Sequence, residues 1–331
     1  MSPPANPAPH AAGATPRLRL LQSELPPVQA LRAELAAGLV APQAAIPPKY
    51  FYDDLGSRLF AAITALPEYT PTRTEAQIFA RHAGDIAGAV GTATTFIDLG
   101  AGDCGKAARL FGALRPRQYV AVDISVDFLR TALQCLQREH PDLDILGIGQ
   151  DFARGLALPG AVGDRRRLFF YPGSSIGNFA PDEAIVFLHR LRACGGADAQ
   201  LLIGVDLIKD EAVLNAAYDD PLGVTAAFNR NVLRHVNRVL GTDFDVAQWK
   251  HVAFYDAAQT RIEMHLEASC DVTVRWPGGG RRFARGERIH TENSYKYRPE
   301  TFAELLRAAG WNPAHIWLDE RAWFALVHCR G

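Results

Sequence analysis

The sequence lacks the features that mark membrane, secreted and nucleic-acid-binding proteins. No stretch approaches the ~18 apolar residues of a membrane-spanning helix. The five cysteines are odd in number, widely spaced and free of any Cys-x-x-Cys pair, so neither a disulfide framework nor a metal site is expected. The 35 basic and 36 acidic residues nearly balance, which argues against nucleic acid or a membrane surface as a partner. We therefore expect a cytoplasmic protein and, without a coiled-coil seam, a monomer.

The first part of the chain is rich in proline and alanine. Residues 1–16 show no basic region followed by an apolar one, so we expect a disordered tail and not a signal peptide. Helices are predicted at 28–38, 57–66 and 75–90, the second with Ser57 as its N-cap. The whole chain has 331 residues and is 48% hydrophobic, enough for two cores of unequal size.

From Glu75 onward short apolar runs alternate with helical patterns, which is typical of a parallel sheet covered by helices on both faces. Strands are predicted at 94–99, 119–124, 143–148, 168–171 and 201–207, with helices at 105–114, 125–139 and 182–194. After Asp206 the alternation stops. A long helical stretch is predicted at 210–240, then strands at 262–268, 272–276 and 288–297 with a turn at 277–280, a helix at 299–309 and a last strand at 323–328.

The glycine-rich turn Asp98-Leu99-Gly100-Ala101-Gly102 predicts a ligand site. It follows a predicted strand, and open parallel sheets bind ligands at the carboxyl ends of their strands. Glycines let the backbone approach a ligand closely, and the next helix directs free N–H groups into the same space. The spacing of Gly100, Gly102 and Gly105, with Asp123 ending the next strand, fits a nicotinamide dinucleotide as well as S-adenosylmethionine.

Three features favour S-adenosylmethionine over the dinucleotide. Asp98 stands two residues before the first glycine and can accept a hydrogen bond from the amino group of a methionine moiety. Gln150-Asp151-Phe152 is suited to hold an adenine edge. The final helix and strand fit the antiparallel closing strand of methyltransferase sheets. We therefore expect a methyltransferase, with a dehydrogenase as the distant alternative.

Several separated segments resemble the histidine Nα-methyltransferases of ergothioneine biosynthesis. They are Tyr52-Asp53-Asp54-Leu55-Gly56-Ser57-Arg58-Leu59-Phe60, Leu66-Pro67-Glu68-Tyr69-Thr70-Pro71-Thr72-Arg73-Thr74-Glu75, Gly173-Ser174-Ser175-Ile176-Gly177-Asn178, Ala217-Tyr218-Asp219-Asp220 with Ala227-Phe228-Asn229-Arg230-Asn231, and Thr291-Glu292-Asn293-Ser294. The sequence departs from the family pattern at Asp103-Cys104-Gly105 and at Thr70.

The resemblance implies an α/β fold: a class I methyltransferase domain with a mostly parallel sheet, plus a smaller α+β substrate domain. The substrate domain would combine 17–72 with an insertion at 208–296. The cofactor-binding core would span 73–207, and 297–331 would return to it. The amino acid would bind between the two domains.

The resemblance also implies roles for individual residues. Glu292 and Ser294 would hydrogen-bond the two imidazole nitrogens, and Met264 would line the same pocket, although its alternation with Ile262 and Leu266 fits plain core packing as well. The remaining substrate residues would be Asn178 and Tyr218 at the carboxylate and amine end, with Tyr69, Gly173 and Phe60 nearby and Tyr52 orienting the amine. The cofactor would contact Asp98, Gly100, Gly102, Lys106, Asp123, Asp151 and Phe152.

The pairing of Glu292 with Ser294 has its own chemical logic. Residues two apart on a strand face the same side. A neutral imidazole offers one N–H donor and one acceptor nitrogen, whereas an indole offers a donor only. We therefore predict stepwise methylation of L-histidine to Nα,Nα,Nα-trimethylhistidine (hercynine). The alternatives are a methyltransferase for another amino acid or a tryptophan-like amine, and a solvated strand face with no binding role for Glu292 and Ser294.

Overall fold

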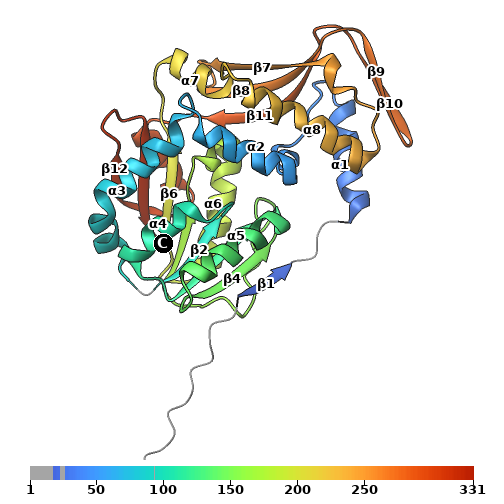
Figure 1. Cartoon of the computed structure of the whole chain (residues 1–331). Helices are drawn as coiled ribbons and strands as arrows, with labels where there is room; N and C mark the ends of the chain where they lie inside the picture. The colour runs from blue at the N-terminus through green and yellow to red at the C-terminus, as the bar shows by residue number, and fades with distance from the viewer. Residues whose placement is uncertain (1–17, 23–26, 93) are drawn as a thin grey trace, which may run out of the picture.

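The computed structural model describes residues 18–22, 27–92 and 94–331, so the tail expected at 1–16 lies outside the described residues (Figure 1). An eight-stranded sheet has the order β1-β4-β3-β2-β5-β6-β13-β12. Its strands are β1 (Arg19–Gln22), β2 (Thr95–Leu99), β3 (Gln118–Asp123), β4 (Asp144–Gly149), β5 (Arg167–Tyr171), β6 (Gln200–Asp206), β12 (Asn312–Leu318) and β13 (Phe324–Arg330). Strands β1 to β6 pair in parallel, and β13 is antiparallel to β6. This confirms the class I methyltransferase sheet and its closing strand.

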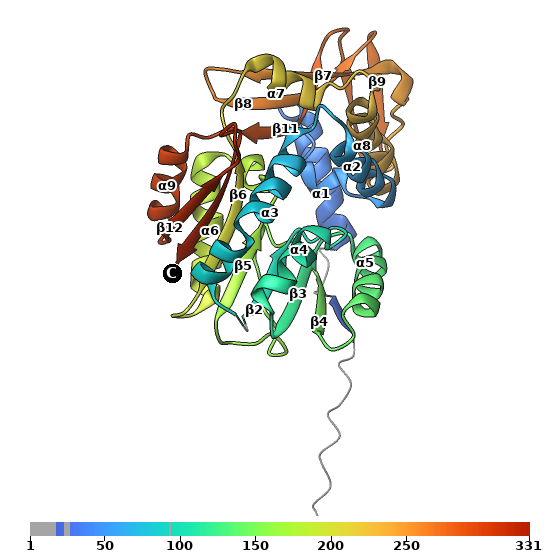
Figure 2. The same cartoon turned by 60° about the vertical axis from the view of Figure 1, so that its left-hand side comes forward.

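Helices cover both faces of this sheet (Figure 2). One face packs against α3 (Thr70–Val90), α4 (Gly105–Leu114) and α5 (Val126–Glu139). The other packs against α6 (Pro181–Gly195) and α9 (Pro299–Ala308). Both faces of the central strands are therefore apolar, as in β2, where every residue is buried.

A third core lies above the carboxyl edge of the sheet in Figure 1 and has a smaller antiparallel sheet, β11-β8-β7. Its elements are α1 (Val28–Val40), η1 (Pro48–Phe51), α2 (Asp54–Ala65), α7 (Glu211–Tyr218), α8 (Val224–Leu240), η3 (Val246–Gln248), β7 (Trp249–Asp256), β8 (Arg261–Ala268), the hairpin β9 (Val272–Trp276) and β10 (Gly279–Phe283), and β11 (Arg288–Tyr295). None of the helices described is long and apolar enough to cross a membrane.

Two backbone bridges tie this third core together and to the large sheet. Ala45 pairs with His290 of β11, so the N-terminal segment joins the later strands. Leu207 pairs with Tyr297, which places the exit from β6 beside the return into α9. Asn231 Nδ2 donates to Asp53 Oδ1 at 2.8 Å, so two of the segments that carry the family resemblance are in contact.

The structure corrects several predicted elements. Helix α2 begins at Asp54, not Ser57, because the Asp53 carboxylate accepts the Gly56 N–H at 2.7 Å and caps the helix one turn earlier. Helix α3 likewise begins at Thr70. The sequence reading missed β1, β7, β10 and β12, and each of these lies at the edge of its sheet. Edge strands carry polar residues on both faces and so lack the apolar alternation that marks a strand.

Candidate active site

The site lies where the order of the large sheet reverses. Strands β2 and β5 are neighbours, while the chain runs from β2 toward β3 on one side and from β5 toward β6 on the other. The glycine turn follows β2, and the segment Gly173–Asn178 follows β5. Both segments therefore meet at the carboxyl edge, the position at which open α/β sheets bind ligands.

The glycine turn and the end of β3 are locked together. Gly100 and Gly102 have φ angles of +72° and +54°, in the left-handed region that favours glycine. The Asp123 carboxylate accepts the N–H of Gly102 at 2.9 Å and that of Ser125 at 2.8 Å. A Cβ on Gly100 would lie 3.7 Å from the Phe152 ring. Four of the expected cofactor residues are thus brought around one backbone turn.

The Asp98 carboxyl lies just beneath this turn. It is 1% exposed, and its Oδ2 accepts the Tyr119 hydroxyl at 2.7 Å. Burial raises its pKa to about 7, although the hydrogen bond from Tyr119 opposes the shift. Its Oδ1 has no hydrogen-bond partner among the described residues. An acceptor left unpaired at this position fits a donor such as the amino group of a methionine moiety.

Lys106 is held by a residue that the sequence reading missed. Glu75, which is 1% exposed, forms an ion pair with Lys106 at 2.8 Å and accepts the Gly173 N–H at 2.8 Å. One buried carboxylate therefore joins an expected cofactor residue to the loop after β5. Asp151 lies at the far end of the site, 3.6 Å from both Lys49 and Arg154.

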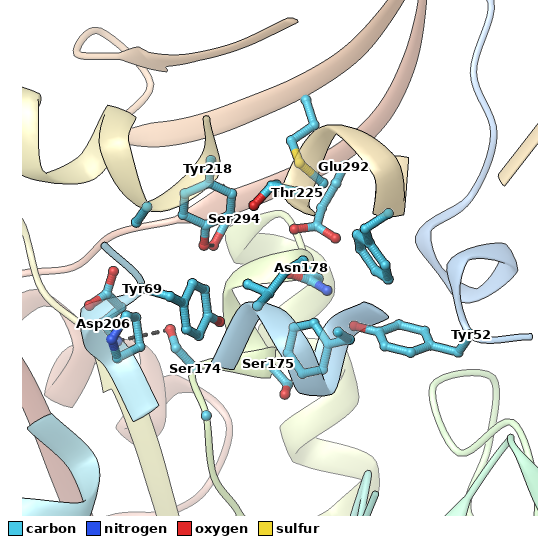
Figure 3. Close-up of a pocket in the computed structure, with 17 residues that line it drawn as sticks. Tyr52, Tyr69, Ser174, Ser175, Asn178, Asp206, Tyr218, Thr225, Glu292 and Ser294 are labelled. Atoms are coloured by element: carbon cyan, nitrogen blue, oxygen red, sulfur yellow. Dashed lines mark hydrogen bonds between the residues drawn. The ribbon is translucent and has the colours of Figure 1, made fainter. Parts of the chain in front are cut away.

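A pocket of about 550 Å³, counted to its open mouth, lies between the loop after β5 and the third core (Figure 3). All nine expected substrate residues line it: Tyr52, Phe60, Tyr69, Gly173, Asn178, Tyr218, Met264, Glu292 and Ser294. They come from α2, the loop after β5, α7, β8 and β11, and from the residues just before α2 and α3.

Aromatic rings form one wall of the pocket. Tyr52 and Phe60 pack edge to face with centroids 5.7 Å apart, and Phe60 lies 6.2 Å from Tyr69. Phe228 of α8, which the sequence reading did not assign, lies 5.9 Å from both Tyr52 and Phe60. Burial raises the pKa of the Tyr52 and Tyr69 hydroxyls, so both remain protonated.

Glu292 and Ser294 lie at the opposite wall and are 8% and 3% exposed, which excludes the solvated strand face. Burial raises the pKa of Glu292 to about 7, and the charge of Lys296 opposes the shift. Met264 pairs with Glu292 across β8 and β11; it both lines the pocket and belongs to the third core. The Tyr218 hydroxyl donates to Ser294 at 2.8 Å, so a residue expected at the carboxylate end contacts one expected at the imidazole.

Two further charged residues lie at this wall, and the sequence did not lead us to predict them. Asp206 lines the pocket at the end of β6, and Lys296 contacts it from just beyond β11 at 3.0 Å. The sequence does contain a pattern that indicates Asp206. It is an acidic residue at the carboxyl end of a strand, as Asp98 and Asp123 are. Lys296 stands two residues after Ser294, on the same face of the strand pattern. No group of three or more metal-ligating side chains occurs within 18–22, 27–92 and 94–331.

The fold, the locked glycine turn and the adjoining pocket define an S-adenosylmethionine-dependent methyltransferase. The chain belongs to the family described as histidine-specific, S-adenosylmethionine-dependent methyltransferases, whose model matches residues 31–331. This membership excludes the dehydrogenase alternative.

The chain is similar to several named proteins. It is 42% identical over 304 residues to the histidine N-alpha-methyltransferase of Mycolicibacterium smegmatis, across 90% of this chain and 94% of that relative. It is 31% identical to ergothioneine biosynthesis protein 1 of Neurospora crassa, across 82% of this chain and 32% of that protein. It is 26% identical to N-methyltransferase dtpB of Aspergillus flavus, across 89% of this chain and 87% of that relative.

Proposed function

We propose that this protein transfers methyl groups from S-adenosylmethionine to the α-amino group of L-histidine, forming hercynine through mono- and dimethyl intermediates as the first step of ergothioneine biosynthesis. The observation that carries the proposal is the placement of Glu292 and Ser294 on one wall of a pocket that is also lined by the loop after β5, the strand next to the one that leads into the glycine turn. An acceptor and a hydroxyl at that spacing match the donor and acceptor of a neutral imidazole. A site built for a hydrogen-bonding ring rejects rings that leave its buried polar atoms unpaired.

S-adenosylmethionine, when bound, supplies an electrophilic methyl group on a sulfonium. The residues of this chain hold the amino acid so that its neutral amine faces that methyl group, because an in-line displacement depends on alignment. Asn178 and Tyr218 would hold the carboxylate and amine end, Tyr218 as an acceptor toward the amine because its own hydrogen is donated to Ser294. Tyr52 would orient the amine, and Tyr69, Phe60 and Phe228 would exclude water. The amine loses its proton to solvent before each attack, so the rate rises with pH until the amine is neutral.

We also propose how the chain is divided into domains. The substrate domain combines 17–72 with 208–296, and the methyltransferase core combines 73–207 with 297–331. The third core, which packs Leu35 to Tyr69 against Leu214 to Ile289, supports this division. We further propose that the protein acts as a monomer in the cytoplasm on small molecules alone, without nucleic acid or membrane. Size-exclusion chromatography with light scattering tests the monomer.

The test is incubation of the protein with S-adenosylmethionine and a panel of amino acids, read by mass spectrometry. We expect three successive additions of one methyl group to histidine and none to tryptophan. The Glu292→Ala variant should lose the preference for histidine while still binding S-adenosylhomocysteine. Methylation of tryptophan or another amine in place of histidine would contradict the proposed substrate, and no product from any amino acid would contradict the proposal altogether.

A further inference from the structure

A buried lysine lies directly behind the serine that faces the pocket. The Lys296 side chain is 0% exposed. Its Nζ lies 3.0 Å from Asp206 Oδ2, 3.0 Å from the Tyr218 hydroxyl and 2.9 Å from Ser294 Oγ. A lysine ammonium has three N–H donors and no acceptor, so these contacts use all of its hydrogens. We refer to Asp206, Lys296, Tyr218 and Ser294 as the Lys296 network; Figure 3 shows three of its members at the pocket.

The donors of this network keep their protons at neutral pH. Burial opposes the charge of Lys296, but Asp206 and the Tyr218 hydroxyl outweigh it and hold the pKa of Lys296 above its ordinary value. Burial also raises the pKa of Tyr218, against the opposing charge of Lys296. Toward Ser294, both groups therefore act as hydrogen-bond donors.

Only one hydrogen-bonding role toward the pocket remains for the Ser294 hydroxyl. Its Oγ accepts from Lys296 at 2.9 Å and from Tyr218 at 2.8 Å. A serine hydroxyl has two lone pairs and one hydrogen, so only the hydrogen remains for the pocket. Glu292, two residues earlier on the same face, is an acceptor alone when ionised. With Glu292 ionised, above its pKa of about 7, strand β11 therefore presents one acceptor and one donor at fixed positions.

We propose that Lys296 is a positioning residue that determines substrate specificity by committing Ser294 to donate. The pocket then selects a ring with an N–H toward Glu292 and an unprotonated nitrogen toward Ser294. A neutral imidazole has both, whereas a pyrrole or an indole has the N–H alone and leaves the Ser294 hydrogen unpaired. This inference rests on the proposed function, because it takes the amino-acid ring to lie against Glu292 and Ser294.

The test compares histidine with two analogues in the Lys296→Met variant. Pyrrolylalanine keeps the ring N–H but lacks the acceptor nitrogen, and thiazolylalanine keeps an acceptor nitrogen but lacks the N–H. We expect the native protein to prefer histidine over pyrrolylalanine about 100-fold in kcat/KM. In Lys296→Met this preference should fall below about 10-fold, because the Ser294 hydrogen can then turn to Tyr218. The preference over thiazolylalanine, which depends on Glu292, should persist.

Lys209→Met is the matched control. Lys209 is also buried and pairs with the other oxygen of Asp206 at 2.5 Å, but within the described part of the chain it forms no hydrogen bond with Ser294. We expect it to leave the preference over pyrrolylalanine within about 3-fold of the native value. Thermal unfolding of both variants reports whether they fold. A folded Lys296→Met protein that keeps the full preference overturns the inference, as does an equal loss in Lys209→Met.

A second measurement needs no variant. Histidine labelled with ¹⁵N in its ring, bound with S-adenosylhomocysteine, shows in its nitrogen chemical shifts which ring nitrogens carry a proton. A neutral ring with one protonated nitrogen supports the inference. A ring protonated at both nitrogens overturns it, because Ser294 would then be accepting. Failure of the native protein to methylate histidine would instead overturn the proposed function, so the two failures are distinguishable.

Discussion

The two sides of the cleft are built in different ways. The proposed cofactor side comes from one stretch of chain, Asp98 to Phe152, and it is fixed largely by backbone: two left-handed glycines whose turn is held by the Asp123 carboxylate. The substrate side gathers side chains from Tyr52 to Ser294, and these meet only when the N-terminal segment pairs with β11. The cofactor side is thus fixed by local structure, and the substrate side by tertiary contacts.

The largest expected effect is confined to the cofactor side. Asp123→Ala removes the acceptor of two backbone N–H groups and a carboxylate expected to contact the cofactor. Hydrogen bonds to charged groups contribute about 1.5–3 kcal/mol each, so affinity for S-adenosylhomocysteine should fall about 100-fold by calorimetry. Asp127→Ala is the control, because this aspartate is 88% exposed on the following helix. A loss of less than about 3-fold in Asp123→Ala would show that the turn does not depend on its carboxylate.

A smaller effect should be confined to the substrate side. Asn178→Ala removes one amide proposed to bind the carboxylate and amine end, and a single hydrogen bond to a charged group contributes about 1.5 kcal/mol. We expect kcat/KM for histidine to fall about 10-fold, with S-adenosylhomocysteine affinity unchanged. Asn293→Ala is the control, because Asn293 lies between Glu292 and Ser294 on β11 but bonds His290 at 2.9 Å. An equal loss of cofactor affinity in Asn178→Ala would break the separation of the two sides.

The difference between the two sides of the cleft also explains which residues could be predicted from the sequence. The parallel strands β2 to β6, the glycine turn and Asp123 are local patterns, and the structure has them where the sequence placed them. The substrate residues lie on segments up to 242 residues apart, Tyr52 to Ser294, and no spacing rule brings these together. They were assigned through the family resemblance, and the structure gathers them in one pocket.

The residues that were missed act through a contact that exists only in the folded chain. Glu75 lies inside a helix, and its partners Lys106 and Gly173 are distant in sequence. Lys296 stands within two residues of an assigned residue, but its role depends on Asp206, 90 positions earlier. Burial of a charged group is decided by what packs over it, and this information is not local.

The smallest expected effect concerns the stability of the substrate side before histidine binds. Burial raises the pKa of Glu292 to about 7 from an ordinary value of 4.5. When the pKa of a carboxyl is higher in the folded than in the unfolded protein, its ionisation destabilises the fold. This loss of stability grows as the pH rises from the unfolded pKa through the folded pKa. Glu292→Gln removes this charge and keeps the shape, so its Tm should exceed the native Tm by about 3 °C at pH 8 and match it near pH 4.

Glu263→Gln, on the neighbouring strand β8, should change the Tm in the opposite direction. Burial there is outweighed by hydrogen bonds from Arg261 and His265, which lower the pKa of Glu263, so its charge stabilises the fold above the unfolded pKa. Its removal should lower the Tm at pH 8, and this loss should disappear only as pH falls below 4.5 through the lower folded pKa. If Glu292→Gln instead lowers the Tm at pH 8, as Glu263→Gln should, the Glu292 carboxylate already has its hydrogen-bond partners within the protein. It then needs no ring N–H from a substrate. The substrate side would then be as self-contained as the glycine turn, and the contrast between the two sides would fail.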